Sequence, residues 1–209
     1  SLTISAQQKL SNINAKISKS IEKHQTELIE ISDAIWAQAE TAMLETNSSK
    51  ILADYAEKNG FKVERGVAGM PTAFVATYGS GKPVISVLGE FDALPGLSQK
   101  SVSTKNPVTD GAPGHGCGHN LFGAGSLGAA IAIKELIASG DLKGTVKFLG
   151  TPSEEAYFGK IWMVREGLWN DVDVNLSWHP SADTKADAQS SLALVDFKIE
   201  FFGQAAHAS

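Results

Sequence analysis

The apolar positions in the first third of the chain follow the period of an α-helix. Isoleucine and leucine recur at steps of three, four or seven residues, at Leu10, Ile13, Ile17, Ile21, Leu28, Ile31 and Ile35. This single stripe predicts one long or broken helix that buries one face. Asn47 and Ser48 then indicate the cap of a second helix over residues 50–59, which Gly60 would end.

After Gly60 the pattern changes from helix to strand. Residues 61–67 and 72–78 are short and rich in β-forming side chains, which is typical of strands. Three further segments have the apolar character of strands covered on both faces; they are residues 83–88, 145–149 and 172–178. Between them, residues 121–137 predict an almost wholly apolar helix whose internal glycines require close packing. Strands alternating with helices predict an α/β fold with a mostly parallel sheet flanked by helices.

The end of the chain has a different pattern. Residues 192–202 alternate between apolar side chains and the polar Asp196, Lys198 and Glu200. This alternation is typical of a half-exposed strand in an antiparallel sheet. We therefore expect one domain over residues 1–186 and the first strand of a smaller α+β domain over residues 187–209. One strand cannot form a stable sheet alone, so this second unit looks unfinished.

Composition excludes several classes of function. The net charge of −5 provides no basic surface for nucleic acid or an anionic membrane. We find no apolar run near the roughly 18 residues of a membrane span, and one cysteine cannot form an internal disulfide. The first 20 residues lack the basic start and apolar stretch of a signal peptide. We expect a cytoplasmic protein, or a periplasmic one if a signal was removed.

Unusual polar residues cluster where predicted strands end and one helix starts. Glu90 and Asp92 follow one strand, GTPSEE (residues 150–155) follows another and His179 follows a third; HGCGHN (residues 115–120) precedes the apolar helix. Each has a plain structural explanation when taken alone. The glycine-rich loop could be a turn with a buried free thiol. The paired glutamates could stand in the first turn of a helix, where the helix dipole favours acidic side chains. His179 could be an ordinary hydrogen-bonded residue.

Taken together, these motifs predict a metal site with hydrolytic chemistry. Open α/β sheets bind ligands at the carboxyl ends of their strands. Thiolate and imidazole are good ligands for zinc, and glycines let side chains at alternate positions converge. Of two neighbouring glutamates, one can bind metal while the other takes a proton from water. A bridging thiolate with two imidazoles and a carboxylate would suit two ions about 3.5 Å apart.

The order GEFDALPG, HGCGHN, GTPSEE and a histidine after the next strand resembles the di-metal aminoacylase and carboxypeptidase superfamily (metallopeptidase family twenty). The match is to its amidohydrolase branch, covers essentially the whole chain and implies a zinc-exopeptidase-like fold. It implies that Cys117 bridges two divalent ions, Zn²⁺ or Mn²⁺. It further implies that His119, Glu155 and His179 are metal ligands. Glu154 would be the general base, and Asp92 would orient a ligand.

The same resemblance leaves three positions open. Glu90 stands where other branches have a histidine, so no ligand role is assigned to it. His115 matches the first histidine of the motif, with its metal binding undecided. Asn120 replaces an aspartate that is common in this branch, so a carboxylate that orients a metal ligand is in doubt at this position.

The last seven residues (GQAAHAS) resemble a segment of the family's dimerisation domain. The resemblance implies that His207 reaches the partner subunit's active site and stabilises an oxyanion; the plain alternative is a surface residue at a frayed terminus. It also implies a homodimer, with or without a second related subunit. The family's last histidine ligand would lie beyond residue 209.

The predicted function is metal-dependent hydrolysis of the amide bond in an N-acyl amino acid of the aminobenzoyl-glutamate type. The substrate would be a small molecule, and we expect neither a nucleic acid nor a membrane partner. Two alternatives stay open. One is a dipeptidase or acyl-amino-acid deacylase of the same superfamily, and the other is a non-catalytic metal-binding module.

Overall fold

The computed structural model describes residues 2–186, 190, 192–195, 197 and 199–204. Helices and strands alternate along most of this chain, and the strands form a five-stranded sheet in the order β1-β2-β4-β3-β5. The elements are α1 (Leu2–Gln38), α2 (Thr46–Lys58), β1 (Lys62–Arg65), the 3₁₀ helix η1 (Val67–Gly69), β2 (Phe74–Ser80), β3 (Val84–Gly89), α3 (His119–Ala138), β4 (Gly144–Gly150), α4 (Gly159–Arg165) and β5 (Val174–Leu176).

The predicted α/β class is confirmed, and the sheet is mixed. Strand β3 pairs in parallel with both β4 and β5, whereas β2 pairs antiparallel with both β1 and β4. Four of the five strands therefore run in one direction and β2 runs against them. Only residues 81–83 separate β2 from β3, and so short a connection reverses the chain, because a parallel crossover needs about a dozen residues or more.

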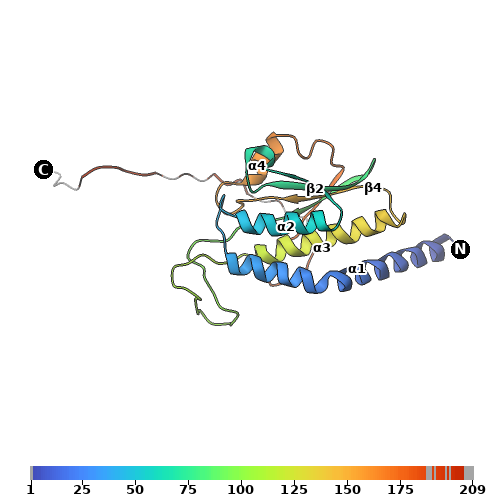
Figure 1. Ribbon diagram of the computed structural model, residues 1–209, viewed down its shortest axis with the longest axis horizontal. Coiled ribbons are helices and arrows are strands. Elements are labelled where there is room, and N and C mark those ends of the chain that lie inside the picture. Colours follow the sequence, from blue (N-terminus) through green and yellow to red (C-terminus); the bar gives the residue numbers. More distant parts are fainter. Residues whose placement is uncertain (1, 187–189, 191, 196, 198, 205–209) are drawn as a thin grey trace.

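Helices cover both faces of the sheet (Figure 1). Helices α1, α2 and α3 lie on one face, and the short helix α4 lies on the other. The main core lies between the three helices and the sheet, and its largest fully buried side chains include Phe74, Phe91 and Phe148. The strands β3 and β4 are central, so their carboxyl ends are held from both sides.

Close packing of α3 explains its glycines. A Cβ atom at Gly123 would lie 2.8 Å from the carbonyl oxygen of Glu90, and one at Gly128 would lie 2.8 Å from a methyl group of Leu28. The predicted reason for these glycines is therefore confirmed. Because Gly123 packs on the chain just after β3, the helix start and the strand end lie together.

The length of α3 corrects one expectation. With its 20 residues and apolar composition it is long enough to cross a membrane, although no run of that kind was expected from the sequence. In this structure it is a core helix, because most of its side chains pack against α1 and the sheet. Its apolar composition is therefore accounted for by burial inside the domain.

The start of α2 is capped differently from the prediction. Asn47 and Ser48 lie within its first turn, and Glu45 precedes the helix. The Glu40 carboxylate accepts hydrogen bonds from the backbone N–H groups of Asn47, at 3.0 Å, and Ser48, at 2.8 Å. A carboxylate from just after the end of α1 thus satisfies the free donors of the helix.

The predicted strand over residues 192–202 is not formed among the described residues of that segment. Their apolar side chains are exposed, with Leu192 96% and Phe201 92% accessible. A strand needs a hydrogen-bonding neighbour, and the described part of the sheet has β5, not this segment, at its edge. The domain boundary near residue 186 stays a prediction.

Candidate metal centre

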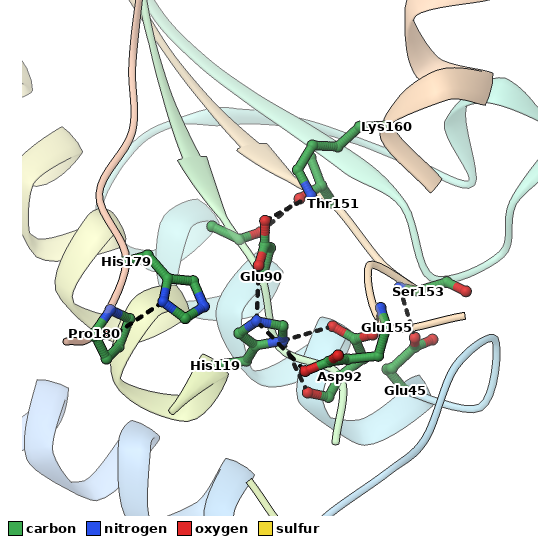
Figure 2. A network of polar contacts seen from close by, with 11 residues as sticks. Glu45, Glu90, Asp92, His119, Thr151, Ser153, Glu155, Lys160, His179 and Pro180 are labelled. Atoms are coloured by element: carbon green, nitrogen blue, oxygen red, sulfur yellow. Dashed lines mark hydrogen bonds and ion pairs between the residues drawn. The ribbon is translucent and has the colours of Figure 1, made fainter. Parts of the chain in front are cut away.

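Polar side chains from three elements meet at the carboxyl ends of the central strands (Figure 2). Glu90 and Asp92 follow β3, and the turn with Glu154 and Glu155 follows β4. His119 is the first residue of α3 and points between them. Topology therefore brings together residues that lie up to 65 positions apart in the chain, as expected for strand ends in an α/β sheet.

His119 is the centre of this cluster and is almost fully buried. Its Nδ1 atom lies 2.9 Å from Asp92 Oδ1, and its Nε2 atom lies 2.9 Å from Glu90 Oε2. Burial by itself lowers the pKa of His119, but the Asp92 and Glu90 carboxylates outweigh it and raise the pKa to about 10. Asp92 also accepts a hydrogen bond from the Glu155 backbone N–H at 2.9 Å, so one carboxylate orients both the ring and the turn.

Two buried atoms in the cluster are left without a hydrogen-bond partner. They are His119 Nε2, whose contact with Glu90 lacks hydrogen-bond alignment, and Glu155 Oε1. These two atoms lie 4.0 Å apart. Because metal–nitrogen and metal–oxygen bonds are each about 2.0–2.2 Å long, two atoms at this separation can share one cation. The residues present therefore fit a metal ion.

Ligand atoms gather in two overlapping groups among the described residues. Glu90, His119 and His179 form one, and His119, Glu154 and Glu155 form the other, with all ligand atoms of each group within 4.8 Å of one another. The rings of His119 and His179 meet edge to face, with centroids 5.6 Å apart. His179 is exposed, so it forms the solvent side of the cluster.

Cys117 lies next to the cluster but belongs to neither of these groups in the described part of the chain. The neighbouring Glu155 carboxylate, together with burial, raises the pKa of its thiol to about 11. The thiol is thus protonated beside a carboxylate at neutral pH. A bound cation reverses this preference, because metal binding requires the thiolate.

Glu154 precedes Glu155 on the same turn and is half-buried. Burial raises the pKa of this carboxyl, and the charge of Glu90 raises it further. A raised pKa moves a carboxylate toward the range in which general bases work well at neutral pH. Glu154 shares a ligand group with His119 and Glu155, and its role as general base stays a prediction.

Two predicted positions serve the structure of the loop. His115 is buried and its Nε2–H donates to the backbone carbonyl of Ile35 at 3.1 Å. The side-chain amide of Asn120 donates to Ser32 Oγ at 3.0 Å. Both contacts fasten the glycine-rich loop to α1, and neither residue belongs to the two ligand groups of the described chain. His207 lies outside the described residues.

Sequence reasoning missed three charged residues of the site. Glu90 was set aside, yet its carboxylate contacts both His119 and Lys160, whose Nζ lies 2.6 Å from Glu90 Oε1. Glu45 is fully buried and accepts a hydrogen bond from the Ser153 backbone N–H at 2.9 Å. The position of Glu90 at a strand end was a usable signal. Glu45 and Lys160 carried none, because only the folded chain brings them near His119.

A cavity of about 780 Å³ opens beside the cluster. Cys117 and His179 line it on the side of the metal centre, and Trp36 and Leu121 contribute apolar surface. The ring of Trp36 stacks on His115, with centroids 6.3 Å apart. This size is within the range of sites that hold small molecules.

Comparison with known proteins shows to which family the chain belongs. The model of peptidase family M20/M25/M40 matches residues 87–208, which is more than half of the chain. The chain belongs to this family. The matched segment includes every residue of the two ligand groups.

Individual relatives show a range of reactions. One of them is named as a subunit of the p-aminobenzoyl-glutamate hydrolase of Escherichia coli (strain K12); it is 45% identical over 194 residues, covering 92% of this chain and 40% of that protein. The human Xaa-Arg dipeptidase is 29% identical over 200 residues, covering 86% of this chain and 41% of that protein. The chain thus spans about two fifths of the length of these curated relatives.

A solved structure from Bacillus subtilis supports the fold. It is described as a dinuclear metal binding peptidase from the M20 family, and it matches with a TM-score of 0.67 and 26% identity. The match covers 78% of this chain and 44% of that one. The sheet flanked by helices is therefore the architecture of this family.

Proposed function

We propose that the protein is a metal-dependent amidohydrolase that cleaves the amide bond of an N-acyl amino acid of the aminobenzoyl-glutamate type. The observation that carries this proposal is the pair of buried ligand atoms on His119 and Glu155 that have no hydrogen-bond partner, with Glu154 beside them. Membership of the peptidase family supports a hydrolytic reaction. The Escherichia coli relative, named for the hydrolysis of p-aminobenzoyl-glutamate, supports the substrate class.

The metal would be held by His119, Glu155 and His179, together with Cys117 as its thiolate. Zn²⁺ and Mn²⁺ both suit this mixture of nitrogen, oxygen and sulfur ligands. When bound, the ions polarise the substrate carbonyl and lower the pKa of a water molecule. Two ions are proposed because a related M20 structure is described as dinuclear.

The remaining chemistry belongs to side chains of this chain. Asp92 holds the His119 ring through Nδ1, so that Nε2 faces the cluster. Glu154 takes the proton of the attacking water and passes it to the amine that leaves. The cavity beside Cys117 would receive the acyl group, and its apolar wall at Trp36 suits an aromatic one.

Assembly is a further part of the proposal. The Escherichia coli relative is named as one subunit of its enzyme, which supports a partner for the complete protein. A homodimer, with or without a second related subunit, would let His207 of one copy reach the site of another. The size of the protein expressed from its complete reading frame, measured by light scattering, tests this point.

The central test is hydrolysis by metal-free and metal-restored protein. Protein expressed from its complete reading frame is stripped with a chelator, reloaded with Zn²⁺ or Mn²⁺, and assayed with p-aminobenzoyl-glutamate, dipeptides and N-acetyl amino acids. We expect activity to depend on metal and to be highest with p-aminobenzoyl-glutamate. Preference for a dipeptide or an N-acetyl amino acid would move the assignment to the sibling activities. Tight metal binding without any hydrolysis would favour a non-catalytic module.

A further inference from the structure

Glu45 is a buried carboxylate close to the metal centre, and the proposed reaction does not use it (Figure 2). Glu45 immediately precedes α2, and none of its surface is exposed. Burial raises the pKa of this carboxyl. Carboxylates are rarely buried completely unless they are paired with other groups, so its contacts indicate what it does.

The carboxylate of Glu45 accepts hydrogen bonds from two distant segments, and Figure 2 shows the one with Ser153. Oε1 accepts from the backbone N–H of Ser153 at 2.9 Å. Oε2 accepts from the hydroxyl of Thr72 at 3.1 Å. Glu45 therefore connects the chain before α2 to the turn that carries Glu154 and Glu155.

The turn after β4 needs such support at Ser153. This residue has a φ of +60°, in the left-handed region that side chains other than glycine seldom adopt. A strained conformation of this kind persists only when neighbouring contacts enforce it. The hydrogen bond from Ser153 N–H to Glu45 acts on the strained residue itself.

Alternate backbone N–H groups hold the whole turn to the body of the domain. Thr151 N–H donates to the carbonyl of Gly89, and Glu155 N–H donates to Asp92 Oδ2, both at 2.9 Å. Ser153 N–H, bound to Glu45, is the middle contact. The carbonyl of Ser153 also accepts from the backbone N–H groups of Tyr157, at 3.2 Å, and Gly159, at 3.4 Å, but both of these bonds lie within the chain that follows the turn. The bond to Glu45 is therefore the contact that holds Ser153 to the chain before α2.

We propose that Glu45 is a positioning residue, which holds the turn at residues 151–155 so that the Glu155 carboxylate faces His119. This inference rests on the proposed metal site, because it assigns Glu45 a role toward a ligand of that site. It also predicts that a neutral acceptor suffices. The side-chain carbonyl of glutamine can accept the Ser153 N–H, whereas methionine fills a similar volume and accepts almost nothing.

The test compares metal affinity in three variants of the protein expressed from its complete reading frame. Glu45→Met removes both acceptors, Glu45→Gln keeps an acceptor for Ser153, and Thr72→Val removes only the other partner. Affinity for Zn²⁺ and for Mn²⁺ is measured by competition with a chromophoric chelator, and thermal unfolding of the metal-free protein is followed by circular dichroism. We expect Glu45→Met to bind metal about 10- to 100-fold more weakly, as for other groups that orient ligands. The other two variants should stay within about threefold of the unsubstituted protein, well below that range.

The outcomes separate this inference from the proposed site. If the unsubstituted protein binds neither ion, the metal site itself is wrong. If it binds metal and Glu45→Met binds equally well, only the role of Glu45 is overturned, and the residue is structural. If Glu45→Met does not fold, Glu45→Asp replaces it, since a carboxylate shortened by one methylene cannot reach Ser153. Unchanged metal affinity in the folded Glu45→Asp protein then overturns the inference.

Discussion

Two buried histidines, each in contact with a carboxylate, have different surroundings in this molecule. His24 lies on α1 and joins it to α2 and α3, with Nδ1 2.9 Å from the Tyr55 hydroxyl and Nε2 3.1 Å from Glu135 Oε1. His119 lies at the strand ends, where Nδ1 is bonded to Asp92 and Nε2 has no aligned partner. His24 has both nitrogens hydrogen-bonded and joins helices, whereas the Nε2 atom of His119 has no hydrogen-bond partner and lies among other ligand atoms, where it can bind a cation.

Charge balance separates the two clusters further. Glu135 is matched by Lys23, whose Nζ lies 2.7 Å away. Around His119, four carboxylates gather near one lysine, Lys160. A cation relieves the repulsion among these acids, and nothing similar is needed beside His24. Ligand atoms without hydrogen-bond partners and excess negative charge together indicate a binding site, whereas a buried histidine alone does not.

The largest expected effect is the loss of activity on changing Glu154, the proposed general base of the cluster around His119. Glu154→Gln should lower kcat about 10²- to 10⁴-fold, because it removes the group proposed to accept the proton of water. Metal content, measured by atomic emission, should not change. The exposed Glu166→Gln is the matched control and should retain activity. Normal turnover in Glu154→Gln would show that another group is the base.

The same substitution at both histidines tests the comparison directly. His119→Gln should weaken Zn²⁺ binding by more than roughly 100-fold, because losing a ligand exceeds the roughly 10- to 100-fold effect of losing a group that orients one. His24→Gln should leave affinity unchanged but destabilise the protein by about 1–3 kcal/mol, since it disturbs a buried hydrogen-bonded network. Isothermal titration and urea unfolding measure the two quantities. Equal loss of metal affinity in both variants would contradict the distinction.

Metal should stabilise the fold through the cluster around His119 and not through His24. At a free Zn²⁺ concentration of about 100 times Kd, binding to the native state adds about 2.7 kcal/mol, or roughly 5–10 °C in Tm for a domain of this size. A chelator should reverse the shift. His24→Gln should keep the shift and His119→Gln should lose it. An identical shift in both variants would place the ion elsewhere.

The smallest effect is a pH dependence of stability at the helix cluster. Burial opposes ionisation of Glu135, but Lys23 and His24 outweigh it and lower the pKa to about 2. A lowered folded-state pKa stabilises the protein at pH values above the ordinary value of 4.5, and this contribution is lost as pH falls toward 2. Urea unfolding at several pH values should therefore show a steeper acid loss in the unsubstituted protein than in Glu135→Gln. Parallel curves would refute the assignment.

The pattern of apolar residues predicted most of the elements, because periodicity is a local property. The stripe from Leu10 to Ile35 became α1, and the strand and helix patterns over residues 61–149 became β1 to β4 with α3 between them. The cap of α2 was wrong because the acceptor, Glu40, comes from the chain just after the preceding helix. The predicted strand over residues 192–202 was wrong for the described residues. Alternation gives a segment one apolar face, but a strand also needs a neighbouring strand to hydrogen-bond with.

At the site, sequence reasoning chose residues by type and by their place after strands. That sufficed to select His119, Glu154, Glu155 and His179, which the structure brings within ligand distance of one another in two groups. Their metal-binding and catalytic roles stay predictions. Cys117 lies beside these groups rather than in them, through its contact with Glu155.

The sequence by itself determined which segments are helices and strands, where the chemically useful side chains follow them, and to which family the chain belongs. Only the tertiary structure decided which of those side chains are unpaired and which hold others in place. Glu45 and Ser153 are 108 positions apart, and no local pattern relates them. Hydrogen bonds between distant segments depend on the packed arrangement of the whole domain, so the positioning of this site could be found only once the chain was folded.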